Sequence, residues 1–265
     1  MKVFQGERHA DFLIERGQAA ALLIHGFPGT PAEMRPIASF LNETGWTTRG
    51  LLLPGFGAQI DSLFQRHPQE WIDAAVEALQ ALKAKHQPIV LIGYSLGAAI
   101  SIHAAAQLKP DQLILLAPFW QLGTRGQRAI FRLIRPIVRH LRPFSRANFN
   151  NPRLRRFLGE FLQDADLDDP DVQQLIRQTK IPVDLFEQIH RMGQQAYHLA
   201  KQIDRPTLIL QGRRDPVVTL LLTQQLMRQF AGSIKYVEID APHQLIDPTL
   251  PDWPQLARAV REFIT

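Results

Sequence analysis

Residues 93–97 read GYSLG, a G-x-S-x-G pattern that is typical of a nucleophilic serine at a sharp turn between a strand and a helix. The apolar residues 88–92 before it read as a buried strand, and the small and apolar residues 98–108 after it read as a helix. The flanking glycines omit side chains that would collide with neighbouring backbone. The pattern predicts that Ser95 presents an exposed hydroxyl; the alternative is an ordinary serine in a nucleotide-binding turn.

A serine hydroxyl is a weak nucleophile and needs a general base, usually a histidine that a carboxylate orients. Asp215 follows a strand-like run at residues 207–210, and His243 follows another at 234–239. Serine, then acid, then histidine is also the chain order of the α/β-hydrolases. We therefore predict that Ser95, Asp215 and His243 form a catalytic triad.

Each of these assignments has an alternative. Asp215 precedes Pro216, so it could instead cap the start of a helix. Asp240 is the nearest rival acid because it lies close to His243 in the sequence, whereas Asp204 comes before its strand and Asp247 fits a surface turn. His243 itself could be a solvated loop residue.

Acyl transfer also requires N–H donors that bind the developing oxyanion. The strand-to-helix turn supplies one donor, the backbone N–H of Leu96. A second is expected from residues 25–30, which read HGFPGT. Proline has no N–H, so Pro28 cannot donate, and we predict that Phe27 does. The alternative is that these glycines and the proline only form a tight turn.

The segments that must position these residues alternate between strands and helices. Strand-like apolar runs recur at residues 19–24, 47–53, 89–92, 112–116, 207–210 and 234–239. A capping box at residues 30–33 predicts a helix to about Thr44, and residues 71–85 carry a helical apolar stripe. This alternation predicts an α/β fold with a mostly parallel central sheet flanked by helices, whose ligands bind beyond the carboxyl ends of the strands.

The alternation stops at residues 118–203, where helix-like periodicity is broken by prolines. We interpret this stretch as a mainly helical cap inserted into a core of residues 1–117 and 204–265. The charge of this stretch is uneven, because residues 160–171 carry six acids. From 125 to 156 the charged residues are all arginines, at 125, 128, 132, 135, 139, 142, 146, 153, 155 and 156.

Such a stripe could lie on an anionic membrane as a basic amphipathic helix. Pro136 and Pro143 interrupt it, however, and the acids could neutralise it, so a solvated, self-paired surface is the preferred interpretation. Phe119 and Trp120 follow the strand at 112–116 and could line an acyl pocket or pack in the core.

Composition excludes several classes of chemistry. The chain has 265 residues, no cysteine and a net charge of +5, which leaves no thiolate chemistry and no cysteine-bound metal. No metal-binding motif and no nucleic-acid module is recognisable. Neither a signal-like apolar region nor a run of about 18 apolar residues is present, which predicts a cytoplasmic protein. The oligomeric state is left open.

These motifs resemble those of serine α/β-hydrolases of the carboxylesterase and monoacylglycerol-lipase type. The similar segments are residues 23–34 (LIHGFPGTPAEM), 53–57 (LPGFG), 93–97 (GYSLG) and 211–215 (QGRRD), together with His243. The resemblance implies the α/β-hydrolase fold, no cofactor and a two-step transfer of an acyl group to water. The chain departs from the family pattern at two positions. Phe56 stands where the family usually has a histidine, and Pro242 stands where it often has a glycine.

The function expected on this basis is cleavage of a small-molecule acyl ester through an acyl-enzyme on Ser95. A thioesterase, an amidase or a hydrolase of carbon-carbon bonds would use the same triad. A non-catalytic binding module with an arginine-rich cap is the alternative from another class.

Overall fold

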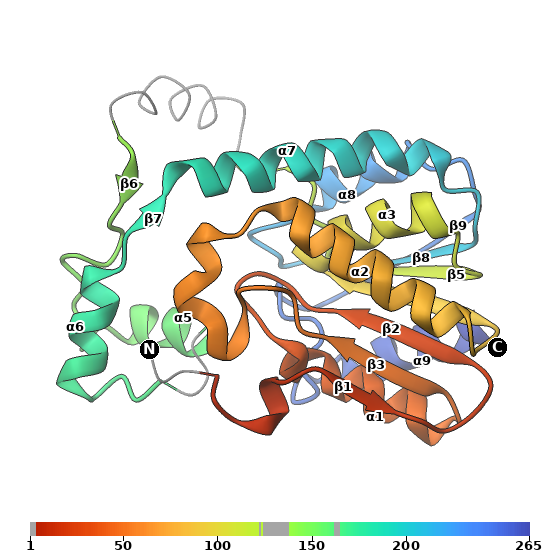
Figure 1. Ribbon diagram of the computed structural model, residues 1–265, viewed down its shortest axis with the longest axis horizontal. Coiled ribbons are helices and arrows are strands. Elements are labelled where there is room, and N and C mark those ends of the chain that lie inside the picture. The colour runs from red at the N-terminus through yellow and green to blue at the C-terminus, as the bar shows by residue number, and fades with distance from the viewer. Residues whose placement is uncertain (1–3, 122, 124–137, 162–164) are drawn as a thin grey trace.

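The computed structural model describes residues 4–121, 123, 138–161 and 165–265 of the chain. In these residues seven strands form one sheet in the order β1-β3-β2-β4-β5-β8-β9 (Figure 1). Neighbouring strands are parallel except β1 and β3, which are antiparallel. The strands are β1 (Phe12–Ile14), β2 (Ala20–Ile24), β3 (Thr47–Leu51), β4 (Ile89–Tyr94), β5 (Gln112–Leu116), β8 (Thr207–Gly212) and β9 (Ile234–Ile239). The predicted α/β fold with a mostly parallel sheet is confirmed.

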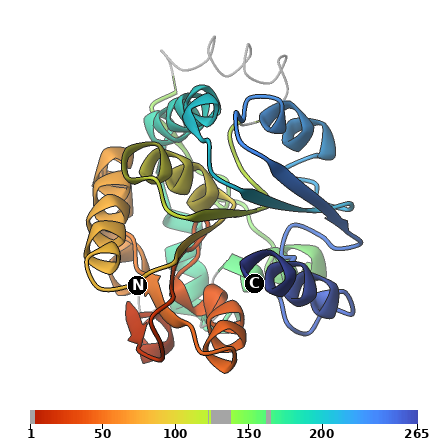
Figure 2. The same ribbon diagram turned by 90° about the vertical axis from the view of Figure 1, so that its right-hand side faces the viewer.

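Helices cover both faces of this sheet, as Figure 2 shows in a view turned by 90° from Figure 1. The cluster of buried residues on one face includes residues of α1 (Arg35–Glu43) and α9 (Trp253–Ile264). The cluster on the other face includes residues of α2 (Pro68–Lys83), α3 (Leu96–Leu108), α7 (Val183–Leu199) and α8 (Leu220–Met227). Two separate cores therefore hold the sheet in place.

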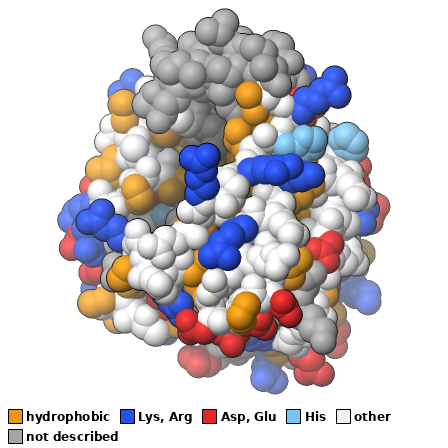
Figure 3. All heavy atoms as spheres, turned by 90° about the vertical axis from the view of Figure 1, so that its left-hand side faces the viewer, with side chains coloured by type: hydrophobic (Ala, Val, Ile, Leu, Met, Phe, Trp, Pro, Cys, Tyr) orange, Lys and Arg blue, Asp and Glu red, His pale blue; other side chains and the backbone are white. Residues whose placement is uncertain are grey.

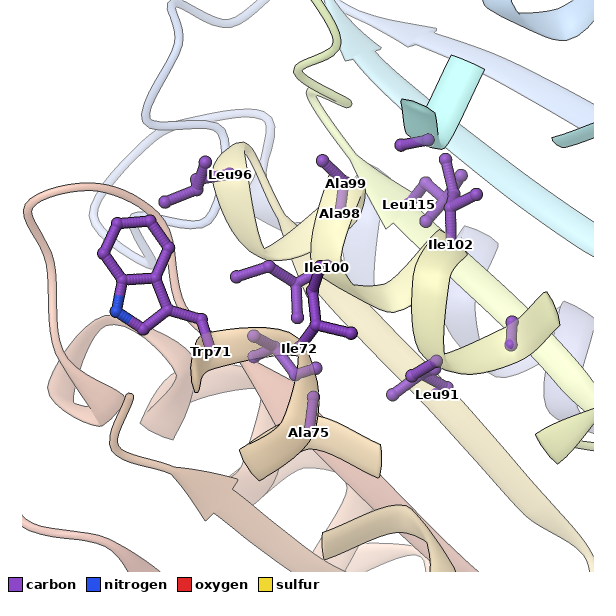
Figure 4. Packing of buried hydrophobic residues seen from close by; sticks show 14 of the residues in the cluster. Trp71, Ile72, Ala75, Leu91, Leu96, Ala98, Ala99, Ile100, Ile102 and Leu115 are labelled. Carbon is purple, nitrogen blue, oxygen red and sulfur yellow. The ribbon is translucent and has the colours of Figure 1, made fainter. Parts of the chain in front are cut away.

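Successive side chains of a central strand point to opposite faces of the sheet, so each central strand contributes residues to both cores. In β4, Leu91 packs with the α2 and α3 side, whereas Val90 and Ile92 pack with the α1 and α9 side. Such strands consist almost entirely of apolar residues because both of their faces are buried. Figure 4 shows Leu91 together with side chains of α2 and α3 from the same buried cluster, among them Ile72 and Ile100.

The first predicted helix begins later than its capping box suggests. Residues Pro31–Met34 form a short 3-10 helix, η2, and the α-helix α1 starts only at Arg35. Three further 3-10 helices occur in the described residues: η1 (Glu7–His9), η3 (Gly57–Gln65) and η4 (Ala200–Gln202). The edge strand β1 has no counterpart among the predicted strands; it is only three residues long, which is too short for a periodic signal.

The segment between β5 and β8 contains α5 (Pro152–Phe161), α6 (Pro170–Gln178) and α7, and the two short strands β6 (His140–Leu141) and β7 (Ile181–Pro182) pair with each other. A small apolar cluster of its own includes Phe149, Leu158 and Ile176. Strands β2 and β3 point toward the side on which α5 and α6 lie (Figure 1). Pro152 begins α5 and Pro170 begins α6, because proline is tolerated in the first turn of a helix.

Candidate active site

Ser95 lies between β4 and α3 in a backbone conformation that L-residues rarely adopt, with φ 51° and ψ −113°. Its N–H donates to the Leu116 carbonyl at 2.8 Å, and its own carbonyl accepts from Ala98 and Phe119 at 3.0 and 3.2 Å. These bonds from the neighbouring strand end and from the helix hold the strained turn in place.

Two glycines make the turn possible because they leave room for other backbone. A Cβ atom at Gly97 would lie 2.2 Å from the Ile24 carbonyl oxygen, and one at Gly93 would lie 2.4 Å from the Gly97 carbonyl oxygen. No side chain fits at either position without moving main chain. The spacing G-x-S-x-G thus follows from the packing of β4 and α3 against β2.

The side chains of Ser95, His243 and Asp215 form one hydrogen-bonded series. His243 Nε2 lies 3.0 Å from Ser95 Oγ, and His243 Nδ1 lies 2.7 Å from Asp215 Oδ2. An ionised carboxylate can only accept, so Nδ1 donates to Asp215 and Nε2 is left to accept from the serine hydroxyl. All three residues are buried. The structure therefore brings together the three residues that the sequence nominates.

Asp215 accepts four hydrogen bonds. They allow it to bond the backbone of the following turn and His243 at the same time. Its Oδ1 accepts from the N–H groups of Val217 and Val218 at 2.7 and 2.8 Å, while Oδ2 accepts from Gln211 Nε2 at 3.1 Å as well as from His243. One carboxylate oxygen thus closes the turn and the other faces the histidine. The helix that follows begins only at Leu220, with Thr219 as its N-cap.

The rival acids have other partners. Asp240 forms an exposed ion pair with Arg214 at 2.9 Å. Asp204 pairs with Lys109 at 3.6 Å and with Arg205 at 3.4 Å. Asp247 accepts from the Thr249 N–H and hydroxyl, as expected of a turn residue. Among the described acids, Asp215 is the one bonded to His243.

The two predicted oxyanion donors come from two different segments, the start of α3 and the loop after β2. Leu96 is the first residue of α3, so its N–H has no acceptor within the helix. Phe27 lies in the loop after β2, whose Gly26 is close enough that an added Cβ would contact Ser95 Cβ at 3.3 Å. In the part of the chain that is described, no protein group accepts the Phe27 N–H. The loop therefore approaches Ser95 with a donor that is available to a ligand.

His25 fixes this loop as a neutral side chain. Its Nε2 accepts the Leu53 N–H at 3.2 Å, so the proton is on Nδ1, which donates to the Gly26 carbonyl at 2.8 Å. Burial lowers the pKa of His25 to about 4, and the hydrogen bond to Gly26 opposes that shift only in part. The side chain stays uncharged at neutral pH.

Glu33 bonds the N–H of the same glycine. The capping-box pattern places its carboxyl group at the Thr30 N–H, but in the structure Glu33 Oε1 accepts the Gly26 N–H at 2.5 Å. Thr30 still caps η2, because its Oγ1 accepts from the Ala32 N–H at 3.3 Å. Burial raises the pKa of Glu33 to about 7. The sequence pattern singled out this residue but assigned it the wrong partner.

A cavity of about 470 Å³ opens beside Ser95. This volume is within the range of ordinary small-molecule sites. The lining includes Glu33, Tyr94, Ser95 and His243 from the core and Gly159 from α5. The cavity thus lies at the carboxyl ends of the strands, between the loops after β2, β4 and β9 and the inserted segment.

Phe119 and Trp120 are not among the described residues that line this cavity. Both belong to the core cluster on the α3 side. The Trp120 ring stacks on Tyr197 with a centroid distance of 4.3 Å, and its Nε1 donates to the Leu222 carbonyl at 2.8 Å. These contacts favour core packing over the pocket role that the sequence also allowed.

The two departures from the family pattern have different surroundings. Phe56 is fully buried and packs edge to face with His25, Phe27 and Trp71. It therefore packs against the loop that carries Phe27, and it is not among the described residues that line the cavity. Pro242, in the loop before the base, leaves His243 within hydrogen-bond distance of Ser95.

The arginine-rich segment is described only in part: Arg125, Arg128, Arg132 and Arg135 lie outside the described residues. Arg139 precedes β6, and residues 143–146 and 149–150 form turns, so this part is not the helix that the spacing suggests. Arg155 makes two hydrogen bonds to Asp168 at 2.9 and 2.8 Å. In Figure 3, basic side chains spread over the upper and middle part of this end of the molecule, and acidic ones gather toward its lower edge.

In the described residues, no group of three or more histidine, aspartate or glutamate side chains is arranged to hold a metal ion. Nor do those residues contain a helix with the length and hydropathy needed to cross a bilayer.

Comparison with known families identifies this arrangement. A family model described as serine aminopeptidase, S33, matches residues 15–244. The chain belongs to this S33 family. The expected resemblance to serine α/β-hydrolases is thereby confirmed for most of the chain, including the loops that carry Ser95, Asp215 and His243.

Two curated proteins are similar to this S33 chain. A thermostable monoacylglycerol lipase from Bacillus sp. (strain H-257) is 26% identical over 213 residues, which cover 78% of the chain and 74% of the lipase. A carboxylesterase from Bacillus subtilis (strain 168) is 32% identical over 92 residues, which cover 34% of the chain and 37% of the esterase.

Solved structures of similar fold cover nearly the whole S33 chain. One, from work on the metagenome-derived lipolytic enzymes LipS and LipT, has a TM-score of 0.74 and 17% identity and covers 97% of this chain and 98% of its own. A monoacylglycerol lipase from Paleococcus ferrophilus has a TM-score of 0.69 and 17% identity, with 96% and 97% covered. At such identities the likeness concerns the fold alone.

Proposed function

We propose that the protein is a serine hydrolase that cleaves carboxylic esters, as a carboxylesterase or a monoacylglycerol-type lipase, through an acyl-enzyme on Ser95. The observation that carries the proposal is the hydrogen-bonded series from Ser95 through His243 to Asp215 beside a cavity of ligand size. The names of the two curated relatives, a monoacylglycerol lipase and a carboxylesterase, support an ester as the substrate.

In the acylation step, Ser95 Oγ attacks the ester carbonyl carbon while His243 Nε2 takes the hydroxyl proton. The carbonyl π electrons move to oxygen, and the N–H groups of Phe27 and Leu96 donate to the resulting oxyanion. When the tetrahedral intermediate collapses, the bond to the alkoxy oxygen breaks and His243 returns the proton to the departing alcohol. Ser95 is left as an acyl ester.

In the second step, water replaces the alcohol. His243 takes a proton from the water as its oxygen attacks the acyl carbon, and the same N–H groups bind the second oxyanion. Collapse releases the carboxylic acid, and the proton on His243 returns to Ser95 Oγ. Asp215 holds the imidazole with Nδ1 protonated and stabilises the imidazolium that forms in both steps.

We also propose that residues 118–203 act as a cap on a core of residues 1–117 and 204–265. The contribution of Gly159 to the lining of the cavity supports this role. Cap geometry would then select the acyl chain and alcohol. Contact of the arginine-rich segment with anionic lipid remains a secondary proposal, which sedimentation with anionic vesicles would test.

The direct test uses p-nitrophenyl esters from acetate to palmitate with wild-type protein, Ser95→Ala and the control Ser62→Ala. Ser62 is half-buried in η3 and is not among the described residues that line the cavity. We expect Ser95→Ala to lose nearly all activity and Ser62→Ala to match wild type. A fluorophosphonate probe followed by peptide mass spectrometry should label Ser95. A folded wild-type protein that neither cleaves any ester nor reacts with the probe would contradict the proposal.

The family description favours a second candidate, hydrolysis of an amide next to a free amino group. The same three residues would catalyse it, with an amine as the leaving group. Adding aminoacyl p-nitroanilides to the assay separates the two candidates, because a higher kcat/KM on the anilides than on the esters would favour the amide.

A further inference from the structure

The loop between β2 and η2 is held at Gly26 by two side chains, the buried His25 and the half-buried Glu33. Glu33 accepts the Gly26 N–H at 2.5 Å, while His25 Nδ1 donates to the Gly26 carbonyl at 2.8 Å. The Gly29 N–H donates to that carbonyl as well, at 3.0 Å, which closes the turn. Both polar groups of one glycine are therefore fixed.

This arrangement determines where the proposed oxyanion donor points. The Gly26 carbonyl and the Phe27 N–H belong to the same planar peptide group, so the bonds to the carbonyl set the direction of that N–H. The preceding peptide group carries the Gly26 N–H, and Glu33 fixes it. Two consecutive peptide planes are thus held, and rotation of the second about the Gly26 Cα is restrained.

Glu33 also fills the inside of the turn. A Cβ atom at Gly29 would lie 2.4 Å from both carboxyl oxygens of Glu33. Glu33 lines the cavity beside Ser95 and is partly accessible from it, although protein surrounds its carboxyl group on the other sides. Its position is set by η2, which Thr30 caps, and Thr30 Oγ1 is in turn 2.7 Å from His9 Nδ1.

We propose that Glu33 is a positioning residue for the oxyanion-binding loop: through the Gly26 N–H it holds residues 26–29 so that the Phe27 N–H points at the oxyanion. This inference rests on the proposed hydrolase function. It makes the Glu33 side chain part of the active site, although its partner is seven residues away and the capping-box pattern ties it to Thr30.

The electrostatics of the site are consistent with this role. A permanently ionised carboxylate beside the oxyanion would repel it. Burial raises the pKa of Glu33 to about 7, so the group is mainly neutral below that pH and can still accept a hydrogen bond. The other titratable side chains among the described cavity-lining residues are Tyr94, His243 and Asp247.

The test compares Glu33→Gln with Glu33→Met in the full-length protein. Glutamine keeps an acceptor oxygen of the same reach, whereas methionine has a similar shape but only a weak sulfur acceptor. Glu77→Gln, on the exposed face of α2, controls for the loss of a carboxyl group. Circular dichroism and thermal unfolding establish that each variant is folded, and kcat and KM are measured on the best p-nitrophenyl ester.

We expect Glu33→Met to lower kcat by about 10- to 100-fold with KM within about threefold of wild type, because a displaced N–H weakens the transition state more than the ground state. Glu33→Gln should stay within about threefold of wild type. Binding of a trifluoromethyl ketone, whose serine adduct carries an oxyanion, should weaken in Glu33→Met by a factor similar to the loss in kcat.

Two outcomes would overturn the inference. If folded Glu33→Met keeps wild-type kcat, the hydrogen bond to Gly26 does not position the donor. If Gln and Met reduce kcat equally, the carboxyl group acts by some means other than accepting that hydrogen bond. Both outcomes require an active wild-type enzyme, so they are distinct from a failure of the proposed function, in which wild-type protein cleaves no ester.

Discussion

The Tyr94 hydroxyl donates a hydrogen bond to the backbone carbonyl of His243 at 3.2 Å, and the two rings lie 5.4 Å apart. The residue directly before the proposed nucleophile therefore holds the loop that carries the proposed base. This contact links the ends of β4 and β9, which are not neighbours in the sheet. It fixes the separation of Ser95 and His243 independently of the hydrogen bond between their side chains.

Tyr94→Phe removes the hydroxyl and leaves the ring. We expect it to lower the free energy of unfolding by about 1 kcal/mol and kcat by a few-fold, because a freer loop places His243 less accurately. Tyr197→Phe is a matched control, since its hydroxyl accepts from Gln229 at 2.9 Å and its side chain does not line the cavity in the described structure. Urea unfolding and ester kinetics measure both effects; equal kcat values for the two variants would contradict the prediction.

Asp215→Asn tests the acid of the triad against its rival. The amide can still accept from Val217 and Val218, but it no longer carries the charge that stabilises the imidazolium. We expect kcat to fall on the order of 10³- to 10⁴-fold, as found for buried triad acids. Asp240→Asn, which breaks only the exposed pair with Arg214, should leave kcat near wild type. The reverse pattern would make Asp240 the acid.

The positions of the triad residues could be inferred from the sequence because each of them follows a recognisable apolar strand. Parallel strands bring their carboxyl ends to one edge, so chain order and strand ends suffice to place Ser95, Asp215 and His243 together. Their catalytic roles remain predictions, as does the division into core and cap.

The partners of Glu33 and Trp120 could not be inferred in the same way. A capping box assigns a glutamate a local partner, whereas Glu33 bonds Gly26 across a turn whose shape depends on the packing of β2 and η2. An aromatic residue after a strand can face a pocket or the core. For Trp120 the stacking on Tyr197, a residue far away in the sequence, favours the core. Both outcomes depend on tertiary contacts that leave no local sequence pattern.

The lowered pKa of His25 predicts a loss of stability in acid. The folded state binds this proton only near pH 4, whereas the unfolded chain binds it near pH 6.5. The unfolded state therefore gains protons first as the pH falls, and the contribution of His25, fully present above pH 6.5, decreases from there toward pH 4. By linkage, about 2 kcal/mol should be lost between pH 7.5 and pH 5.

This loss is measured as the difference between wild type and His25→Gln in urea unfolding at the two pH values. The comparison is necessary because Glu33, with its raised pKa, acts in the opposite direction: its contribution to stability decreases as the pH rises from about 4.5 to about 7. Glu33 is unchanged in both proteins, so its effect cancels. Parallel pH dependence in the two would contradict the prediction, and an NMR titration of His25 would check its pKa directly if His25→Gln does not fold.

Gly97→Ala tests whether close packing dictates the G-x-S-x-G spacing. The new methyl group would lie 2.2 and 2.5 Å from the Ile24 and His25 carbonyl oxygens, which belong to main chain and cannot move without shifting β2 and the loop that carries Phe27. We expect a loss of more than about 3 kcal/mol in the free energy of unfolding, or no folded protein.

Gly159→Ala is the matched control, because no atom of the described residues lies within 4 Å of a Cβ at that position in α5. Alanine is the better helix former, so this variant should gain about 0.5 to 1 kcal/mol. Thermal and urea unfolding of the two variants therefore give effects of opposite sign for the same chemical change. If Gly97→Ala folds with wild-type stability, the glycine is dispensable, and the strained turn at Ser95 must be maintained by its backbone hydrogen bonds to Leu116, Ala98 and Phe119 alone.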